Sequence, residues 1–442
     1  MDISLPRQAT VKLNHLLLMT EEHPNVILVE GPRQVGKTTV VEQCLEQGKL
    51  PHVSFNLEKD LRHKAAIDRC TDFNDFSDWL ADEFQFKPDG SKILFIDEAQ
   101  ESRKLGSFVR SMKEEWKNTK VILTGSMMSR LFRDDIRYPV GRVTTLAIQP
   151  FSFFEFLEAW GKTDWIDQLK TGEKISSSRH QHLLEALNTY LHIGGLPRVV
   201  IDFLNEKEAT PTLTEIFENY RNDFIRVFGE DQGYLFEKTL QAVADHVGSP
   251  SKFSQALLPN DPSYRKVASV YSRLEAWRMI YTSLQRGPQP EGTTQYHPKR
   301  YLFDMGLLNF LRTLGVPPID VLTTSEAIHR QTLGGIFENM AAFYMVHWDQ
   351  RLTGWKKAPA GMEVDFIARF GEKTIPIECK AALKTKESHL TGLKKYMQEY
   401  TLDVGVVVNA APFEKRTFPF GAIFACPLYA VEALPEILAG TQ

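Results

Sequence analysis

The chain has 442 residues, of which 43% are hydrophobic and 24% charged, and its 52 basic and 56 acidic residues leave a formal net charge of −4. This balance is typical of a globular protein and excludes a disordered chain, a coiled coil and a collagen-like repeat. The length predicts two to four domains, at roughly 100–200 residues each. A net charge this close to zero gives no sign of nucleic-acid binding, although a local basic face can be offset by an acidic one.

The cysteines and the hydropathy pattern both bear on the cellular compartment of the protein. None of the cysteines stands in a C-x-x-C pair, which argues against a zinc site or a disulfide framework and fits a reducing environment. The amino terminus shows no signal-peptide pattern, and the longest apolar runs are too short to cross a membrane. We therefore expect a cytoplasmic protein without a membrane partner.

The amino-terminal third alternates short apolar runs with amphipathic segments. Uninterrupted apolar strands between helices are typical of a parallel sheet covered on both faces. The alternation predicts an α/β fold with a doubly wound parallel sheet over residues 1–150. The expected strands are Asn25–Glu30, His52–Asn56, Lys92–Asp97 and Lys120–Thr124, and the expected helices are Thr38–Gln47, Asp72–Phe84 and Ser107–Trp116.

A glycine-containing loop, GPRQVGKT, lies between the first expected strand and the helix that follows it. It fits the pattern G-x-x-x-x-G-K-[ST], in which backbone N–H groups and a helix amino terminus surround a phosphate. Lys37 would reach the β- and γ-phosphates of ATP, and the Thr38 hydroxyl would hold Mg²⁺. The predicted ATP-binding residues here are Gly31, Pro32, Arg33, Gln34, Val35, Gly36, Lys37, Thr38 and Thr39.

Two carboxylates follow directly on the third expected strand, in the sequence ILFIDE. A parallel strand delivers such residues at its carboxyl end, where α/β proteins bind ligands. We expect Asp97 to act on Mg²⁺ and Glu98 to polarise the attacking water as a general base. Ser126 or Thr124, at the end of the next strand, is expected to sense the γ-phosphate.

Two arginines are candidates for neutralising charge during phosphoryl transfer. Arg142, in the sequence VGR, is the predicted catalytic arginine, and Arg130 is a second candidate. Either would act within its own chain or on a neighbouring subunit. The alternative is that both are solvated surface residues.

The middle of the chain is predicted to be helical and then to resemble a winged helix. Residues 151–230 begin with the aromatic-rich helix Phe151–Trp160 and are interrupted by a glycine break at His192–Pro197. Residues 231–320 contain an expected helix, Ser263–Met279, and then two extended runs within Ile280–Phe303. This order is typical of a winged helix, which binds DNA in some proteins and packs against protein in others.

The expected helix Ser263–Met279 has a clear division between apolar and basic positions. Its apolar face is formed by Val267, Val270, Tyr271 and Leu274. Arg265 and Lys266 remain for another face, where they would meet phosphates or bases if the helix entered a groove of DNA. DNA is therefore a predicted partner, and protein contact or packing on the ATPase is the alternative.

The last third, residues 321–442, predicts a second α/β domain. A helix is expected at Phe337–Trp348, followed by strands near Glu363–Arg369, Thr374–Cys379 and Val404–Asn409. The spacing Asp365…Glu378-Cys379-Lys380 resembles the D…ExK pattern of restriction-endonuclease-like nucleases. Two residues apart on a strand, Glu378 and Lys380 share one face.

The D…ExK residues suggest metal chemistry. Asp365 and Glu378 are predicted to bind Mg²⁺ or Mn²⁺, and Lys380 to orient the attacking water and stabilise charge on the phosphate. By resemblance to such nucleases, Glu338 on the preceding helix completes the metal site. The alternative is that Glu378 and Lys380 form only an ion pair in a domain kept for binding.

Several motifs together resemble the AAA-type ATPases of bacteria and archaea in which a carboxy-terminal domain of unknown function follows. The resemblance is carried by GPRQVGKTT, LFIDEAQ, ILTGS and QPFSFFEF, and later by YLHIGGLP, RLEAWRM and YLFDMGLL. It implies that Asp97 and Glu98 take the family's Mg²⁺ and water-activating positions and Ser126 its sensor position. It also implies a homo-oligomer, because such ATPases act as rings.

Three functions are compatible with these motifs. The first is a Mg²⁺-dependent ATPase coupled to a nuclease-like domain that binds and cleaves DNA. The second is an ATPase that switches DNA binding without cleavage, and the third is an ATPase that controls a protein partner.

Overall fold

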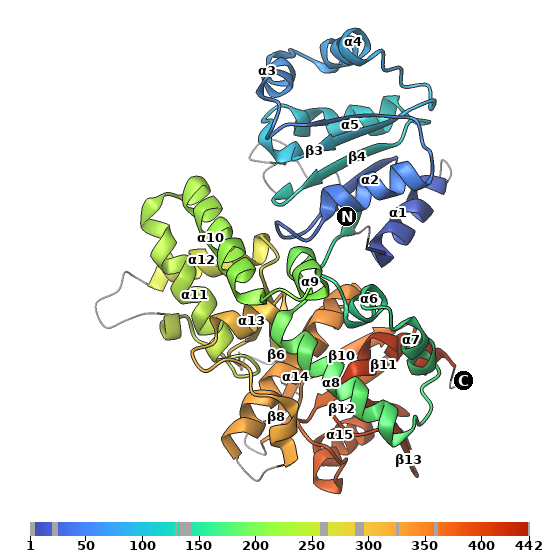
Figure 1. Cartoon of the computed structure of the whole chain (residues 1–442), viewed down its shortest axis with the longest axis vertical. Coiled ribbons are helices and arrows are strands. Elements are labelled where there is room, and N and C mark those ends of the chain that lie inside the picture. The colour runs from blue at the N-terminus through green and yellow to red at the C-terminus, as the bar shows by residue number, and fades with distance from the viewer. Residues whose placement is uncertain are drawn as a thin grey trace. The chain divides into compact units, whose positions relative to one another are not determined.

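The computed structural model describes residues 5–19, 25–128, 131–132, 141, 143–256, 264–287, 296–323, 327–357 and 361–440. The chain divides into two compact units, residues 1–149 (unit 1) and 150–442 (unit 2), which Figure 1 shows in colours running from blue to red along the chain. The domain boundaries predicted within the second of these units, at 230 and 320, stay predictions.

Unit 1 is built on a five-stranded sheet in the order β2-β3-β4-β1-β5, with every pair parallel. The expected parallel α/β sheet is confirmed. A fifth strand, β5, was not predicted because its sequence VTTLA is only partly buried and carries two threonines. The strands are β1 (Val26–Glu30), β2 (His52–Asn56), β3 (Ile93–Asp97), β4 (Val121–Gly125) and β5 (Val143–Ala147).

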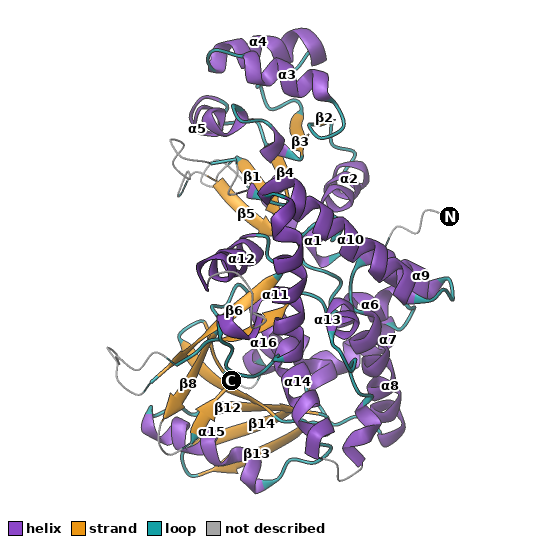
Figure 2. Ribbon diagram, turned by 90° about the vertical axis from the view of Figure 1, so that its left-hand side faces the viewer, coloured by secondary structure: helices purple, strands orange, loops and turns teal. Residues whose placement is uncertain are grey.

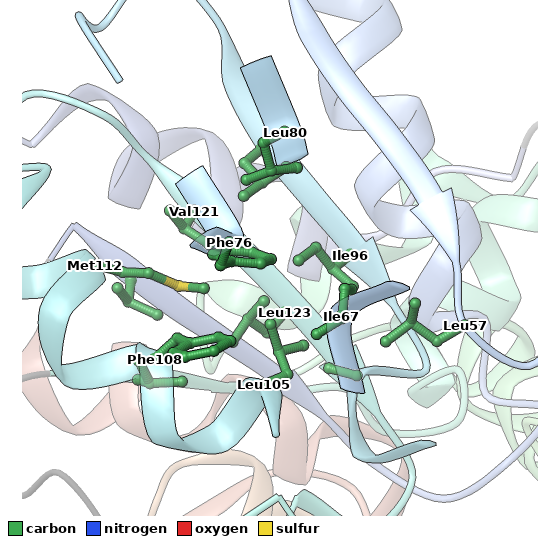
Figure 3. Close-up of a cluster of buried hydrophobic side chains, with 14 of the residues drawn as sticks. Leu57, Ile67, Phe76, Leu80, Ile96, Leu105, Phe108, Met112, Val121 and Leu123 are labelled. Atoms are coloured by element: carbon green, nitrogen blue, oxygen red, sulfur yellow. The ribbon is translucent and has the colours of Figure 1, made fainter. Parts of the chain in front are cut away.

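Helices cover both faces of this sheet, with α2 and α5 on opposite sides (Figure 1). Between the sheet and one helical layer lies a core of buried apolar side chains, in which Phe76 and Phe108 stack with centroids 5.0 Å apart (Figure 3). Burial of this kind supplies most of the stability of such a layer. The helices are α1 (Gln8–Leu18), α2 (Lys37–Gln47), α3 (Leu61–Arg69), α4 (Phe73–Phe84) and α5 (Leu105–Glu115).

The first part of unit 2 is helical, as expected. Its first helix, α6, starts with a capping box in which Ser152 and Glu155 satisfy each other's backbone N–H groups. The predicted glycine break separates α8 from α9. The helices are α6 (Phe153–Ala159), α7 (Thr163–Lys170), α8 (Ser177–Ile193), α9 (Pro197–Leu204), α10 (Ala209–Phe228), α11 (Gly233–Asp245), α12 (Tyr264–Ala276) and α13 (Met305–Leu311).

The end of unit 2 contains a mixed five-stranded sheet in the order β10-β11-β12-β14-β13. Figure 2 shows β12, β13 and β14 in orange, with α15 packed beside β12. The strands are β10 (Phe366–Phe370), β11 (Lys373–Cys379), β12 (Val404–Asn409), β13 (Glu414–Phe418) and β14 (Gly421–Pro427), and the helices are α14 (Ala327–His347), α15 (Glu387–Glu399) and α16 (Leu434–Ala439).

A second sheet in unit 2 joins strands from the middle and the end of the chain, in the order β7-β6-β8-β9. β6 pairs antiparallel with β7 and parallel with β8. One sheet therefore spans the predicted boundary at residue 320. Its strands are β6 (Ile280–Arg286), β7 (Lys299–Leu302), β8 (Thr353–Lys357) and β9 (Met362–Val364).

The helix expected at Phe337–Trp348 begins ten residues earlier, at Ala327. Glu338 consequently lies in the middle of α14 and not near its start, which corrects the prediction. The first half of the helix was not predicted because Gly334 and Gly335 interrupt it, and glycine disfavours a helix interior. Gly335 is required by packing, since a Cβ there would lie 2.2 Å from the carbonyl oxygen of Val247.

Candidate functional site

The loop between β1 and α2 is shaped around the side chain of Lys37. Gly36 precedes the helix with a φ of 88°, a left-handed conformation that glycine adopts without strain. The Lys37 ammonium donates hydrogen bonds to the carbonyl oxygens of Gly31 (3.0 Å) and Pro32 (2.8 Å). Burial lowers the pKa of Lys37 to about 8, although the nearby carboxylates oppose this shift. The loop thus holds a positive charge at its centre.

Asp97, at the carboxyl end of β3, collects hydrogen bonds from three neighbouring side chains. Its Oδ2 accepts from the Thr38 hydroxyl (2.9 Å) and from Asn56 Nδ2 (2.6 Å), and its Oδ1 accepts from the Thr124 hydroxyl. Asp97 itself is buried. The oxygen set of Asp97 and Thr38 is of the kind that Mg²⁺ prefers, so these residues fit the predicted metal.

Glu98 follows with a φ of 52°, a left-handed conformation that is unusual for a residue other than glycine. Its Oε2 accepts a hydrogen bond of 2.5 Å from Gln100 Nε2. Burial raises the pKa of Glu98, although Lys37 opposes this shift. Strained backbone of this kind is concentrated at functional sites, where it aims a side chain.

Two residues of this site were not predicted from the sequence. Asn56 stands opposite Asp97 in the parallel pairing of β2 with β3. Its position as the last residue of an expected strand was a signal for it, because the carboxyl ends of neighbouring parallel strands meet at the same edge of a sheet. Arg7 is buried and donates to the carbonyl oxygens of Val35 (3.0 Å) and Gln149 (2.6 Å). It therefore ties the loop to the segment after β5, a link that no local pattern indicates.

The other predicted site residues of unit 1 have no hydrogen bond to Lys37, Asp97 or Glu98 among those described above. Arg33 forms an ion pair of 3.3 Å with Glu58, and Ser126 is half-buried just after β4. Thr39 is exposed on α2. Arg130 and Arg142, the candidate charge-neutralising arginines, lie outside the described residues.

A second group of charged residues lies inside unit 2, where three acidic side chains surround one lysine. Lys299 Nζ lies 2.9 Å from Glu338 Oε2, 2.6 Å from Glu363 Oε1 and 2.8 Å from Asp365 Oδ1. We call the three acidic residues the carboxylate cluster. Burial alone would lower the pKa of Lys299, but the carboxylates raise it well above its ordinary value. The lysine is therefore charged.

The ExK residues, Glu378 and Lys380, lie close to Asp365 of this cluster. Asp365 Oδ2 accepts a hydrogen bond of 2.9 Å from the backbone N–H of Cys379, and Lys380 forms an ion pair with Glu378 Oε1. Burial and the neighbouring Asp365 raise the pKa of Glu378, whereas Lys299 and Lys380 hold the pKa of Asp365 below its ordinary value despite burial.

The structure thus brings Glu338 and Asp365 together, but through a lysine that sequence reasoning missed. Lys299 stands in the run PKRYLF, where a basic pair opening an apolar strand is the only signal for it. Within the described ranges, no three His, Cys, Asp or Glu side chains are grouped so as to hold a metal ion. The predicted metal site of Glu338, Asp365 and Glu378 stays a prediction.

Family models match three parts of the chain. The family model of an AAA domain matches residues 23–157, which contain the loop, Asp97 and Glu98. These residues form an AAA domain. Two domains of unknown function follow it, DUF8612 at residues 184–318 and DUF4143 at residues 333–431. The second of these contains the carboxylate cluster and the ExK residues.

Similar proteins exist beyond the family models. An uncharacterized protein of Haemophilus influenzae is 26% identical over 223 residues, which are 49% of this chain and 52% of that protein, so the match spans about half of each. A Walker-type ATPase of Pyrococcus abyssi is 14% identical with a TM-score of 0.44, covering 70% of this chain and 96% of that one.

A further solved structure, the RuvB Holliday junction branch migration motor of Thermotoga maritima, is 13% identical with a TM-score of 0.31 and covers 63% of this chain and 90% of that one. Among the helices of the described ranges, none is long and apolar enough to span a membrane.

Proposed function

We propose that the AAA domain hydrolyses ATP with Mg²⁺, using Lys37 for the phosphates, Thr38 and Asp97 for the metal, and Glu98 for the attacking water. The observation that carries this proposal is the hydrogen bond from Thr38 to Asp97 beside a buried, charged Lys37. Bound Mg²⁺ would neutralise charge on the phosphates.

The role of Glu98 follows from its surroundings. Gln100 holds one carboxylate oxygen, so the side chain has a fixed direction, and burial makes it a better proton acceptor than an exposed glutamate. The water oxygen attacks the γ-phosphorus, Glu98 takes a proton from the water, and the bond to the β-phosphate oxygen breaks. The products are ADP and inorganic phosphate.

Two variants and one control test the proposal through phosphate release and nucleotide binding. Lys37→Ala is expected to lose both activities, whereas Glu98→Gln is expected to bind ATP but to release phosphate at least about 100-fold more slowly. Lys117→Ala, an exposed lysine of the same unit, should match the unaltered protein. Phosphate release by Lys37→Ala at the normal rate would contradict the assignment.

A second function is favoured by α12. Its predicted apolar face is confirmed, because Val267, Val270, Tyr271 and Leu274 are all buried. Arg265 and Lys266 are exposed, and β6 and β7 follow as a pair of antiparallel strands. This order supports a winged helix, and we propose that it binds DNA under the control of ATP without cutting it.

Fluorescence anisotropy with duplex DNA tests this second function. Reversing both charges, in Arg265→Glu with Lys266→Glu, is expected to weaken binding and to lower its salt dependence. Arg278→Glu, which reverses a charge beyond the end of α12, serves as the control. Mg²⁺-dependent cleavage of plasmid DNA would instead favour the nuclease, and capture of a protein partner without DNA binding would favour the third function.

A further inference from the structure

The carboxylate cluster of unit 2 already holds a cation that belongs to the chain. We propose that the Lys299 ammonium takes the place of a divalent metal ion among Glu338, Glu363 and Asp365, and so keeps these residues from binding one. This inference concerns unit 2 alone and holds whether or not the AAA domain hydrolyses ATP.

The ammonium group contacts all three acidic residues of the cluster, with hydrogen bonds to Glu338 and Asp365 and an ion pair with Glu363. A lysine ammonium has three N–H donors, and Lys299 Nζ has oxygens of three acidic residues within 2.9 Å. A divalent metal would need the same oxygens, at still shorter distances. The two cations therefore compete for one position.

Packing holds Lys299 in this position. It is 2% exposed and opens β7, where it pairs with Ser283 of β6. The next residue, Arg300, is also buried, and its guanidinium lies over the ring of Tyr271 at 4.4 Å while donating to the Ser251 carbonyl oxygen at 3.2 Å. The pairing of β7 with β6 therefore fixes the backbone from which the Lys299 side chain reaches the cluster.

Beside the cluster, Glu378 has a second buried oxygen that could take part in binding a cation. The residue is 6% exposed, and no donor within the described ranges reaches its Oε2. A buried carboxylate oxygen without a donor is costly unless a cation or water satisfies it. We infer that, once Lys299 is absent, this oxygen and the carboxylate cluster have to be satisfied by another cation, and that a divalent ion can take this role.

The experiment measures Mn²⁺ binding to the full chain by electron paramagnetic resonance, without nucleotide. Asp97→Asn is present in every sample, so that the predicted metal ligand of unit 1 does not contribute. Lys299→Met removes the ammonium and keeps the length of the side chain. Lys356→Met is the matched control, because Lys356 Nζ lies 3.5 Å from Glu363 Oε2 but outside the cluster.

We expect the background protein and Lys356→Met to bind no Mn²⁺ in unit 2. Lys299→Met should bind one Mn²⁺ per chain, at least about tenfold more tightly than any residual binding by the background, and should lose it when Asp365→Asn is added. If Lys299→Met is unfolded by circular dichroism, refolding by Mn²⁺ supports the proposal and failure to refold contradicts it.

Three other results would overturn the proposal. The first is a folded Lys299→Met that binds no Mn²⁺. The second is Mn²⁺ binding by the background protein that Asp365→Asn abolishes. The third is Mg²⁺-dependent cleavage of DNA by protein with Lys299 intact that Asp365→Asn abolishes. Phosphate release by the chain without Asp97→Asn is measured separately, and its loss would concern the AAA domain only.

Discussion

The amide of Asn56 donates a hydrogen bond of 2.6 Å to the same carboxylate oxygen of Asp97 that accepts from Thr38. The two residues stand side by side because β2 and β3 pair in parallel with Asn56 opposite Asp97. The strand next to the acidic pair therefore fixes the direction of the predicted Mg²⁺ ligand.

Replacing Asn56 by leucine should slow ATP hydrolysis more than it weakens ATP binding. The Asp97 carboxylate would lose a donor that orients it, and loss of such a partner typically costs 10–100-fold in activity or metal affinity. We expect the turnover number to fall by about tenfold, measured as steady-state phosphate release. Ser54→Ala, on an exposed position of the same strand, is the control; equal rates for both variants would contradict the prediction.

Nucleotide affinity should fall as the pH rises above about 8. Burial lowers the pKa of Lys37 to about 8, so the ammonium that we propose to meet the phosphates is lost above that pH, and bound phosphate would favour its charged form. Affinity is expected to drop by up to about tenfold per pH unit, measured with a fluorescent ATP analogue between about pH 7.5 and 9.5. Lys37→Arg should bind more weakly but independently of pH, because its guanidinium stays charged.

Asp304 should make the stability of unit 2 decrease as the pH rises from about 4 to 6. Its carboxylate accepts from the N–H groups of Gly195 (2.7 Å) and Leu307 (2.8 Å), yet burial raises its pKa from 3.8 to about 6. Between about pH 4 and 6 the folded state therefore binds more protons than the unfolded state. The free energy of unfolding falls by about 3 kcal/mol as the pH rises through this range, and Asp304 adds no further change above about pH 6.

Urea unfolding of the unaltered protein and of Asp304→Asn at several pH values measures this effect. The asparagine does not titrate, so the difference in unfolding free energy between the two proteins should change between pH 4 and 6 and stay constant above. A difference that is independent of pH would show that Asp304 titrates normally.

Arg7→Lys should destabilise unit 1 although the charge is retained. The guanidinium reaches two carbonyl oxygens, of Val35 and Gln149, from one buried position, and an ammonium cannot match that fork. We expect a loss of about 2 kcal/mol in the unfolding free energy of this unit, together with weaker ATP binding. Arg69→Lys, at an exposed position on α3, should have no effect on either measurement.

The AAA domain could be predicted closely because its signals are local. The expected strand His52–Asn56 matches β2, and the acidic pair Asp97 and Glu98 stands at the end of β3 as expected. β5 was missed because a half-exposed edge strand does not need an apolar sequence.

The charged interior of unit 2 could not be predicted in the same way. Asp365 and Glu378 were found through their spacing, but Lys299 precedes them by more than sixty residues and reaches them only through the pairing of β6 with β8. Contacts of this kind depend on tertiary structure, for which a single sequence carries no local signal. Arg273 of α12 shows the same limit, since no local pattern indicates that it donates to Gln232 at 2.9 Å and lies over the Phe228 ring at 4.2 Å.

The shared sheet of unit 2 also determines how the chain can be divided. Cutting it near residue 320 would leave β6 without β8, and each fragment would present a row of unpaired backbone N–H and C=O groups. Such open strand edges pair with other chains and cause aggregation. The two regions of unknown function are therefore expected to be soluble only when they are expressed together, as one piece from Pro150 onwards.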